Sequence, residues 1–213
     1  MEKPSSLRTH SAGPLPGGSH GLTREEVATQ QRNRLLVAMV EVAAEKGYVA
    51  TSVADVLRRS RVSRLTFYEH FANKEACFIA AYELVTDILA ERIEEAARLG
   101  GTPLERLDRV IGAYLTGLAA EPEVARVFLV EVYAAGVEVL GRRLTVQATL
   151  TAWVAELFGA TTAEQRLACE TVVGALVSLV TTRVLTGDLA ALAALREPFV
   201  ALVARLMPPE NEP

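Results

Sequence analysis

The feature that most constrains how this chain can fold is an apolar pattern of helical period, which runs from Thr23 to about Pro208 with few breaks. Large apolar residues recur at spacings of three, four and seven, and the strict alternation of a half-buried strand is scarce. Glycine and proline fall where such helices should stop. We therefore expect an all-α fold.

The positions of these breaks predict a succession of helices. Thr23 and Glu26 form a capping box that should begin the first helix, and Gly47 should end it. Pro198 should kink or divide the last helix, because proline lacks a backbone donor and clashes with the preceding turn. The expected helices cover approximately residues 23–46, 52–60, 63–71, 74–99, 103–120, 122–134, 137–158, 162–186 and 189–206.

Charge is distributed unevenly along the chain. Residues 24–74 hold nine Lys or Arg against six Asp or Glu, residues 75–213 hold eleven against nineteen, and the whole chain carries −4. A basic front on an acidic body suggests that the front meets a polyanion. Chance fluctuation explains so small a local excess equally well, so charge alone leaves both alternatives open.

Several classes of protein find little support. Cys77 and Cys169 stand far apart without metal-ligand spacing, which indicates reduced, buried thiols in a cytoplasmic protein without a metal or other cofactor. No charged n-region followed by an apolar segment opens the chain, so we expect no signal peptide. The most apolar stretch, Thr171–Thr182, is too short to span a bilayer and is expected to be a fully buried helix with no membrane contact.

The most specific local pattern is TSVADVLRRSRVSRLTFYEHFANKEACF, residues 51–78. Ser52 should begin a short helix with a capping box, and Ser63 should cap a second helix after a tight turn. Val62 and Phe67 flank that second cap as a hydrophobic staple, which fixes the angle at which the chain enters the helix. The pattern predicts a helix-turn-helix, whose second helix is suited to a DNA major groove.

The same stretch resembles the signature of the TetR family of regulators, V-S-x-x-[TS]-[LFI]-Y-x-[HY]-F-x-x-K-[ED]-x-L, preceded by G-Y-x-x-T-S-V-x-D-V. The resemblance covers about residues 30–80 and departs at Arg61 and Leu65, where glycine is common. At Arg61 a left-handed backbone would carry a cost. The matching positions are Gly47, Tyr48, Thr51, Ser52, Val53, Asp55, Val56, Val62, Ser63, Thr66, Phe67, Tyr68, His70, Phe71, Lys74 and Glu75.

This resemblance implies an N-terminal three-helix DNA-binding domain and a larger helical domain for ligand binding and dimerisation. We place a flexible arm at residues 1–23, the DNA-binding domain at 24–73, the regulatory and dimerisation domain at 74–208, and a tail at 209–213. Members of the family are usually homodimeric repressors of palindromic operators in double-stranded DNA. A small-molecule effector releases them.

The second helix and the caps around it supply the DNA contacts that the resemblance implies. Arg64 and Thr66 are candidates for base edges, because arginine can pair with guanine through two hydrogen bonds, and Leu65 could pack on a thymine methyl. Tyr68 and Lys74 are expected to bind phosphate. The full predicted set is Thr51, Ser52, Arg61, Ser63, Arg64, Leu65, Thr66, Tyr68, His70 and Lys74.

Signals in the regulatory region are weaker. Small residues at helical spacing permit close helix approach, which suits either a dimer interface or packing within one subunit. Aromatic side chains could line a mainly apolar effector cavity or belong to the ordinary core. Arg142 and Arg143 are expected at the surface, the alternative being contact with an anionic ligand. The interface candidates are Gly174, Ala175, Ser178 and Thr181, and the cavity candidates are Tyr82, Tyr114, Phe128, Tyr133 and Trp153.

Two other functions remain open. One is an all-helical small-molecule carrier or enzyme that does not act on DNA. The sequence offers it little, because it has three histidines and no nucleophile elbow, phosphate-binding loop or metalloprotease motif, so we do not expect an enzyme. The other is a DNA-binding factor without a ligand.

Overall fold

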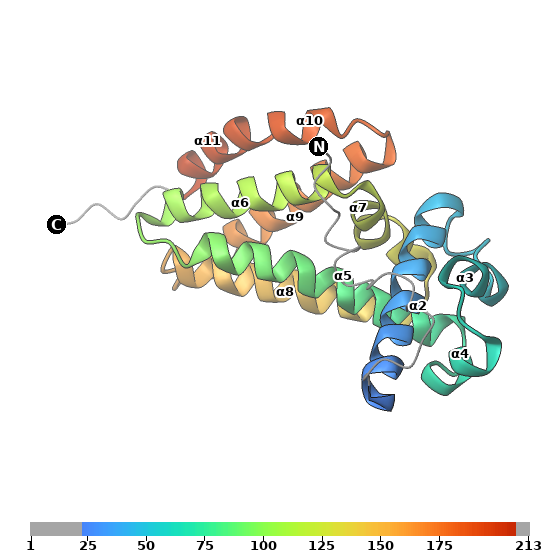
Figure 1. Ribbon diagram of the computed structural model, residues 1–213. Helices are drawn as coiled ribbons and strands as arrows, with labels where there is room; N and C mark the ends of the chain where they lie inside the picture. Colours follow the sequence, from blue (N-terminus) through green and yellow to red (C-terminus); the bar gives the residue numbers. More distant parts are fainter. Residues whose placement is uncertain (1–22, 208–213) are drawn as a thin grey trace, which may run out of the picture.

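The computed structural model describes residues 23–207, and every regular element in that range is a helix (Figure 1). The predicted all-α class is therefore confirmed. The predicted tail, and all of the predicted arm except its last residue, lie outside the described residues. The elements are α2 (Arg24–Lys46), α3 (Val53–Ser60), α4 (Arg64–His70), α5 (Lys74–Ala97), α6 (Pro103–Ala120), α7 (Pro122–Leu129), the 3-10 helix η1 (Glu131–Ala134), α8 (Val137–Leu157), α9 (Ala163–Leu185), α10 (Ala190–Ala194) and α11 (Arg196–Leu206).

The helices form two groups that share one long element (Figure 1). The short helices α3 and α4 lie with α2 at one end of the molecule, and the long helices α5, α6, α8 and α9 extend away from them. Helix α5 packs against α2 as well as against α6. The division that we predict between residues 73 and 74 thus falls at the start of a helix that serves both groups.

Side-chain caps begin several helices, because they satisfy backbone donors that the first turn leaves free. At α3 the Ser52 hydroxyl oxygen accepts the Asp55 N–H at 3.2 Å, and the Asp55 carboxylate accepts the Ser52 N–H at 3.0 Å. Asn73, which sequence reasoning missed, caps α5 by accepting the Ala76 N–H at 2.8 Å. The caps predicted at Thr23, Ser52 and Ser63 are confirmed.

The predicted helix at residues 122–134 is wrong in one respect, because it divides into α7 and η1. The reason lies in a buried carboxylate. Glu131 accepts hydrogen bonds from the Tyr48 N–H at 2.8 Å and from Arg126 Nε at 3.1 Å. A buried charge needs such partners, and the tightened backbone of η1 keeps Glu131 against them.

The last predicted helix, at residues 189–206, is divided as expected, but not at Pro198. Helices α10 and α11 meet at Leu195, three residues earlier. Pro198 is the third residue of α11, within the first turn, where backbone N–H groups have no partner in the helix. Proline therefore removes no helical hydrogen bond there.

Helix α9 corrects a further expectation, since the stretch Thr171–Thr182 is not fully buried. The 23-residue helix has a mean hydropathy of 1.5 in its most apolar window, and 28% of that window is buried. Among helices of the described residues, it alone is long and apolar enough to cross a membrane, judged by length and composition. Exposed apolar surface of this kind is typical of a site that contacts another protein or a membrane.

The turn between α3 and α4 places Arg61 in the left-handed region, with φ 55° and ψ 34°. Within residues 23–207 it is the one non-glycine residue with positive φ. The Arg61 N–H donates to Leu57 O at 2.9 Å, and its side chain is exposed. The strain that sequence analysis anticipates at this position is therefore present.

Substitutions at Arg61 measure how much its left-handed backbone lowers the free energy of unfolding. Arg61→Gly and Arg61→Ala remove the same charge, yet only glycine adopts positive φ freely, so the glycine variant should be more stable by about 1 kcal/mol. This reverses the usual order of these residues near a helix. Thermal unfolding followed by circular dichroism measures it, and an alanine variant at least as stable as the glycine variant would contradict it.

Candidate functional site

A rigid support fixes the second helix of the helix-turn-helix. Val62, Phe67 and Phe71 are buried, with Phe67 fully enclosed, as the predicted staple requires. The rings of Phe67 and Phe71 lie 5.7 Å apart between centroids, and Tyr68 packs edge-on to Phe67 at 5.3 Å. Helix α4 therefore has one face anchored in the core.

The opposite face of α4 points to solvent. Arg64 is exposed, Leu65 is 73% exposed and Tyr68 is 50% exposed. Thr66 is half-buried, and its Oγ1 lies 2.9 Å from the hydroxyl of Ser63, the residue that caps the helix. This face offers a cation, an apolar side chain and hydroxyl groups, which are the chemistries that read base edges and phosphates.

The hydroxyl groups of two residues in the predicted DNA-binding set donate within the protein. Thr51 is buried, and its hydroxyl donates to Gly47 O at 2.8 Å. The Ser52 hydroxyl donates to the Asp55 carboxylate at 2.6 Å. Because each hydroxyl has a single proton, neither is a free donor, so both serve the fold.

Lys74 and His70 lie at the edge of the exposed face. The Lys74 ammonium donates to Tyr48 O at 3.0 Å and lies 4.1 Å from the centroid of the Tyr48 ring. An ammonium has three donors, so Lys74 keeps capacity for phosphate. His70 is half-buried at the end of α4.

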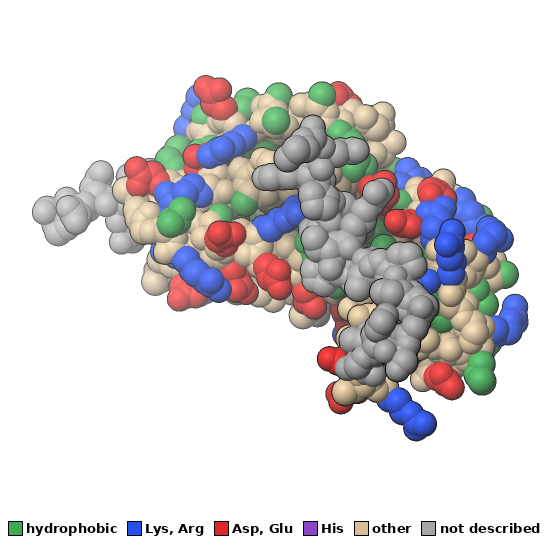
Figure 2. All heavy atoms as spheres, in the orientation of Figure 1, with side chains coloured by type: hydrophobic (Ala, Val, Ile, Leu, Met, Phe, Trp, Pro, Cys, Tyr) green, Lys and Arg blue, Asp and Glu red, His purple; other side chains and the backbone are tan. Residues whose placement is uncertain are grey.

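Ion pairs within the fold neutralise much of the basic charge around α3. Arg59 pairs with Glu41 at 3.0 Å and with Glu45 at 2.6 Å. Arg58 pairs with Asp55 at 2.7 Å. Both arginines of this basic front are therefore paired with carboxylates within the fold. Figure 2 shows blue side chains gathered over this end of the molecule, with red ones among them.

Asp55 is the centre of this network. Its carboxylate accepts hydrogen bonds from the Lys46 ammonium, from Ser52 and from Arg58, and these hold its pKa well below the usual range. Lys46 is the largest cause. The carboxylate thereby ties the end of α2 to the start of α3, which positions the helix-turn-helix.

The depressed pKa of Asp55 makes the stability of the fold depend on pH under acidic conditions. An unfolded Asp takes up a proton near pH 4, whereas the folded carboxylate stays ionised below that value, so stability falls as the pH drops below about 4. Asp55→Asn should be less stable near neutrality and should lose part of this acid dependence. Urea unfolding from about pH 3 to about pH 7 measures both effects.

The matched control removes a carboxylate that forms only an exposed pair. Glu94 meets Arg98 one turn along α5 at 3.2 Å, and both side chains are largely exposed. Glu94→Gln should leave the pH profile close to that of the wild type, since exposed pairs contribute little. Retention of the full acid dependence in Asp55→Asn would refute the role given to Asp55.

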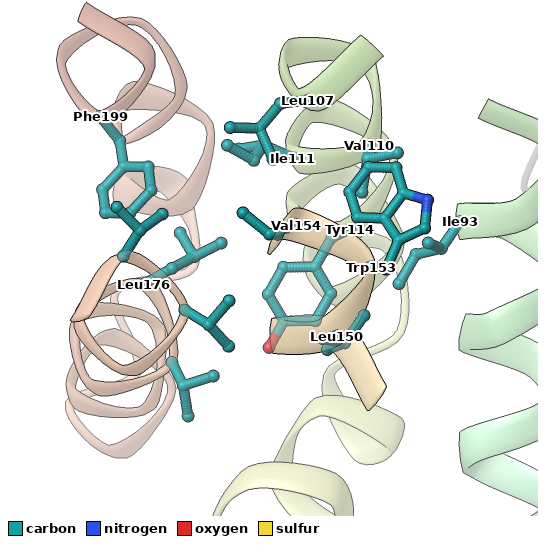
Figure 3. A pocket seen from close by; sticks show the side chains of 13 residues that line it. Ile93, Leu107, Val110, Ile111, Tyr114, Leu150, Trp153, Val154, Leu176 and Phe199 are labelled. Atoms are coloured by element: carbon teal, nitrogen blue, oxygen red, sulfur yellow. The ribbon is translucent and has the colours of Figure 1, made fainter. Parts of the chain in front are cut away.

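Two apolar cavities lie among the helices that follow α4. The larger, of about 340 Å³, lies among α5, α6, α7 and α8 and includes Phe128, Tyr114 and Trp153 in its wall. The smaller, of about 60 Å³, shares Tyr114 and Trp153 and reaches α9 and α11 (Figure 3). The larger volume lies within the range of small-molecule sites.

Three of the five predicted cavity residues therefore line these cavities, and two do not. Tyr82 is buried and stacks on Phe128, a residue of the larger cavity's wall, with ring centroids 5.7 Å apart. Tyr133 is 56% exposed and lies on η1. An aromatic residue in a helical pattern does not reveal whether its ring meets a cavity, a neighbouring ring or solvent.

A joint between the two groups was missed at the sequence level. Glu131 of η1 binds the backbone of Tyr48, which follows α2, across 83 positions of sequence. The Tyr48 ring in turn packs edge-on to Phe78 of α5 at 4.6 Å. A lone acid within the apolar run VFLVEVYAA was the available signal, because a charge in such a run needs a buried partner.

Metal chemistry finds no support in the described part of the chain. Residues 23–207 contain no group of three or more His, Cys, Asp or Glu side chains that could hold an ion. Cys77 and Cys169 are buried and free, as expected, and burial raises the pKa of the Cys77 thiol to about 12.

Comparison with known proteins supports the interpretation of the N-terminal region. Residues 35–81 match the family profile described as bacterial regulatory proteins, tetR family. The chain is 28% identical over 97 residues to the HTH-type transcriptional repressor KstR of Mycolicibacterium smegmatis, covering 46% of this chain and 48% of KstR. It is 30% identical over 105 residues to the fatty acid metabolism regulator protein of Bacillus subtilis, covering 49% and 54%. The matched segments span about half the length of these curated relatives.

Similarity to solved structures extends over most of the fold. The transcriptional regulator FadR from Bacillus subtilis, solved in complex with stearoyl-CoA, superposes with a TM-score of 0.70 at 25% identity, covering 80% of this chain and 96% of FadR. The fatty acid degradation regulator FadR from Bacillus halodurans gives a TM-score of 0.70 at 24% identity, with the same coverage.

Proposed function

We propose that the chain is a member of the TetR family of bacterial regulatory proteins and a homodimeric transcriptional repressor that a small molecule releases from its operator. One observation carries the proposal. Helix α4 has its inner face anchored by Phe67 and exposes Arg64, Leu65 and Tyr68 along its outer face. Such a function acts on DNA and thus belongs in the cytoplasm.

The proposed DNA contacts divide into two kinds. Arg64, Thr66 and Leu65 would meet base edges, while Tyr68 and Lys74 would meet phosphate. Arg61, Ser63 and His70 complete the proposed surface at its ends. We leave Thr51 and Ser52 out of the set, because their hydroxyl protons are already donated within the protein.

Substitutions on α4 separate base contacts from phosphate contacts. Arg64→Ala should cost about 1–3 kcal/mol on the preferred sequence and relax the preference at one base step. Tyr68→Phe should weaken binding about tenfold or more on all sequences alike, since it removes one hydrogen bond to an anionic phosphate. Selection from a random DNA pool, followed by fluorescence anisotropy over a salt series, measures both.

Both side chains are exposed, so circular dichroism should show unchanged folding in each variant. Absence of binding to any palindromic DNA, or binding that is insensitive to salt, would favour an all-helical carrier that does not act on DNA. Equal loss on every sequence in Arg64→Ala would move Arg64 to the phosphate contacts.

A second copy of the chain is the proposed partner of α9. The exposed and half-exposed positions Leu167, Thr171, Gly174, Ser178 and Leu185 recur at intervals of three, four and seven, and none of them is charged. An uncharged stripe of that spacing is suited to pairing with another helix. Ala175 and Thr181 flank the stripe. A dimer also supplies the two recognition helices that successive grooves require.

Gly174 tests this interface. A Cβ added at Gly174 meets no atom within 4 Å in the single chain, so the side chain of Gly174→Leu begins in open space in one subunit. Against a closely packed second copy the added side chain clashes. We expect the mass measured by light scattering to fall from twice 23.0 kDa towards 23.0 kDa.

The control is Thr116→Leu, which adds an exposed leucine on α6, away from the α9 stripe. It should leave the dimer intact. A Gly174→Leu variant that remains dimeric would remove Gly174 from the proposed interface. A wild-type chain that is monomeric at all concentrations would refute the homodimer itself.

The proposed effector is a mainly apolar molecule bound between α5, α6 and α8. The larger cavity is lined chiefly by Leu, Ile, Val, Ala and aromatic side chains. The structurally similar FadR from Bacillus subtilis is described in complex with stearoyl-CoA, a molecule with a long acyl chain. An acyl or comparable hydrocarbon chain is therefore the class of effector that we propose.

A further inference from the structure

Arg143 is buried without an acidic partner. Its side chain on α8 is 8% exposed, and no carboxylate of residues 23–207 lies within ion-pair distance of it. Its neighbour Arg142, by contrast, is exposed and pairs with Glu83 and Glu138. Sequence analysis expected both arginines at the surface, which is wrong for Arg143.

The contacts that Arg143 does make are neutral. Its Nη1 donates to Gln147 Oε1 at 3.2 Å, and its guanidinium lies 4.8 Å from the centroid of the Tyr133 ring. A guanidinium carries five N–H donors and keeps its charge throughout the physiological range. Removing such a group from water is costly unless a negative charge compensates it.

Two further unpaired donors belong to the same cluster. The hydroxyls of Tyr82 and Tyr114 are buried and have no hydrogen-bond partner among the described residues. Burial raises the pKa of both phenols, that of Tyr82 to about 12, while the nearby charge of Arg143 opposes the shift. Both therefore remain protonated near neutral pH. The cluster thus presents hydrogen-bond donors and a positive charge, with Gln147 Oε1 as its acceptor.

This cluster adjoins the larger cavity. Val146 and Leu150 line that cavity, and Arg143 lies three and seven residues before them, on the same face of α8. Tyr114 lines the cavity directly. Figure 3 shows its ring pointing into the adjoining smaller pocket, with the hydroxyl at the Leu150 end. An apolar chamber therefore ends at a buried group of donors.

We propose that the effector is an amphipathic carboxylic acid, whose carboxylate binds Arg143, Tyr82 and Tyr114 and whose hydrocarbon part fills the cavity beside Trp153. That this ligand acts as an effector rests on the proposed function, but its binding to the cavity does not require DNA. A carboxylate accepts several hydrogen bonds at its two oxygens, which matches three donor groups that lack an acidic partner. Its charge compensates the buried guanidinium.

Trp153 provides the readout. It is the single tryptophan of the chain and lines both cavities, so its fluorescence reports occupancy without any DNA. The probes are decanoate, decan-1-ol and decylamine, which share the hydrocarbon and differ in the head group. We expect the wild type to bind decanoate at least about tenfold more tightly than decan-1-ol, since hydrogen bonds to charged groups contribute that much. Decylamine should bind more weakly than either.

Two substitutions test whether Arg143 causes the preference for decanoate over decan-1-ol. Arg143→Met should abolish the advantage of decanoate while leaving decan-1-ol binding within about twofold, because the hydrocarbon contacts remain. Arg142→Met is the matched control, and it should keep the wild-type preference. An Arg143→Met variant that binds decanoate as the wild type does would overturn the proposal, as would a wild type that binds decan-1-ol equally well.

Tyr114→Phe tests the site with a variant that is expected to fold normally. Its hydroxyl has no partner among the described residues, so its removal should leave the melting temperature unchanged or raised. Decanoate affinity should nevertheless fall about tenfold or more, since the lost hydrogen bond is one to a charged carboxylate. A stable Tyr114→Phe variant with unchanged decanoate affinity would remove Tyr114 from the site.

Decyl phosphate separates two sources of negative charge. Three donor groups satisfy the two oxygens of a carboxylate but leave a dianionic phosphate partly unpaired in a buried site, so decanoate should bind more tightly. The reverse order would overturn the carboxylate assignment. If the wild type prefers decanoate but binds no operator DNA, that result would count against the proposed function and leave the carboxylate site standing.

Discussion

A single buried carboxylate joins the two halves of the molecule. Glu131 accepts the Tyr48 N–H and the Arg126 guanidinium, and these lie on opposite sides of the joint. Without Glu131, the buried Tyr48 N–H would lose its partner, which costs more than the hydrogen bond itself contributes. This contact therefore helps to hold the helix-turn-helix against the long helices, together with the packing of α2 on α5 and α7.

The same short element connects the joint to the proposed effector site. Glu131 and Tyr133 are two residues apart on η1, and the Tyr133 ring lies under the Arg143 guanidinium. A ligand that changes the environment of Arg143 thus acts on an element bonded to the DNA-binding group. Such a contact transmits a signal only if the ligand binds two arrangements of η1 with different affinity.

The single chain leaves part of its apolar surface uncovered on α9, and that surface has the spacing of a helix pair. A repressor of this plan needs two recognition helices at a fixed separation, so covering α9 with a second copy would meet both requirements at once. The cavity lies against α8, which packs on α9. Ligand occupancy and subunit arrangement would then share the same helices.

Much of the fold was predictable because the signals are local. Capping boxes such as Ser52 with Asp55 link residues three positions apart, and the staple of Val62 and Phe67 links residues five apart. Short-range patterns of this kind persist in any tertiary context, so helix bounds and the exposed face of α4 followed from them. The break after α7 did not, because a partner distant in sequence caused it.

The sequence by itself determined the helical class, the helix-turn-helix and the type of residue that its outer face carries. Only the tertiary structure decided that Thr51 is buried, that Tyr133 faces away from the cavities and that Arg143 lies inside without an acidic partner. The physical reason is that helical periodicity fixes which side chains share a face, but not what that face meets. Burial of a charge, or closure of a cavity, depends on helices that are brought together from far along the chain.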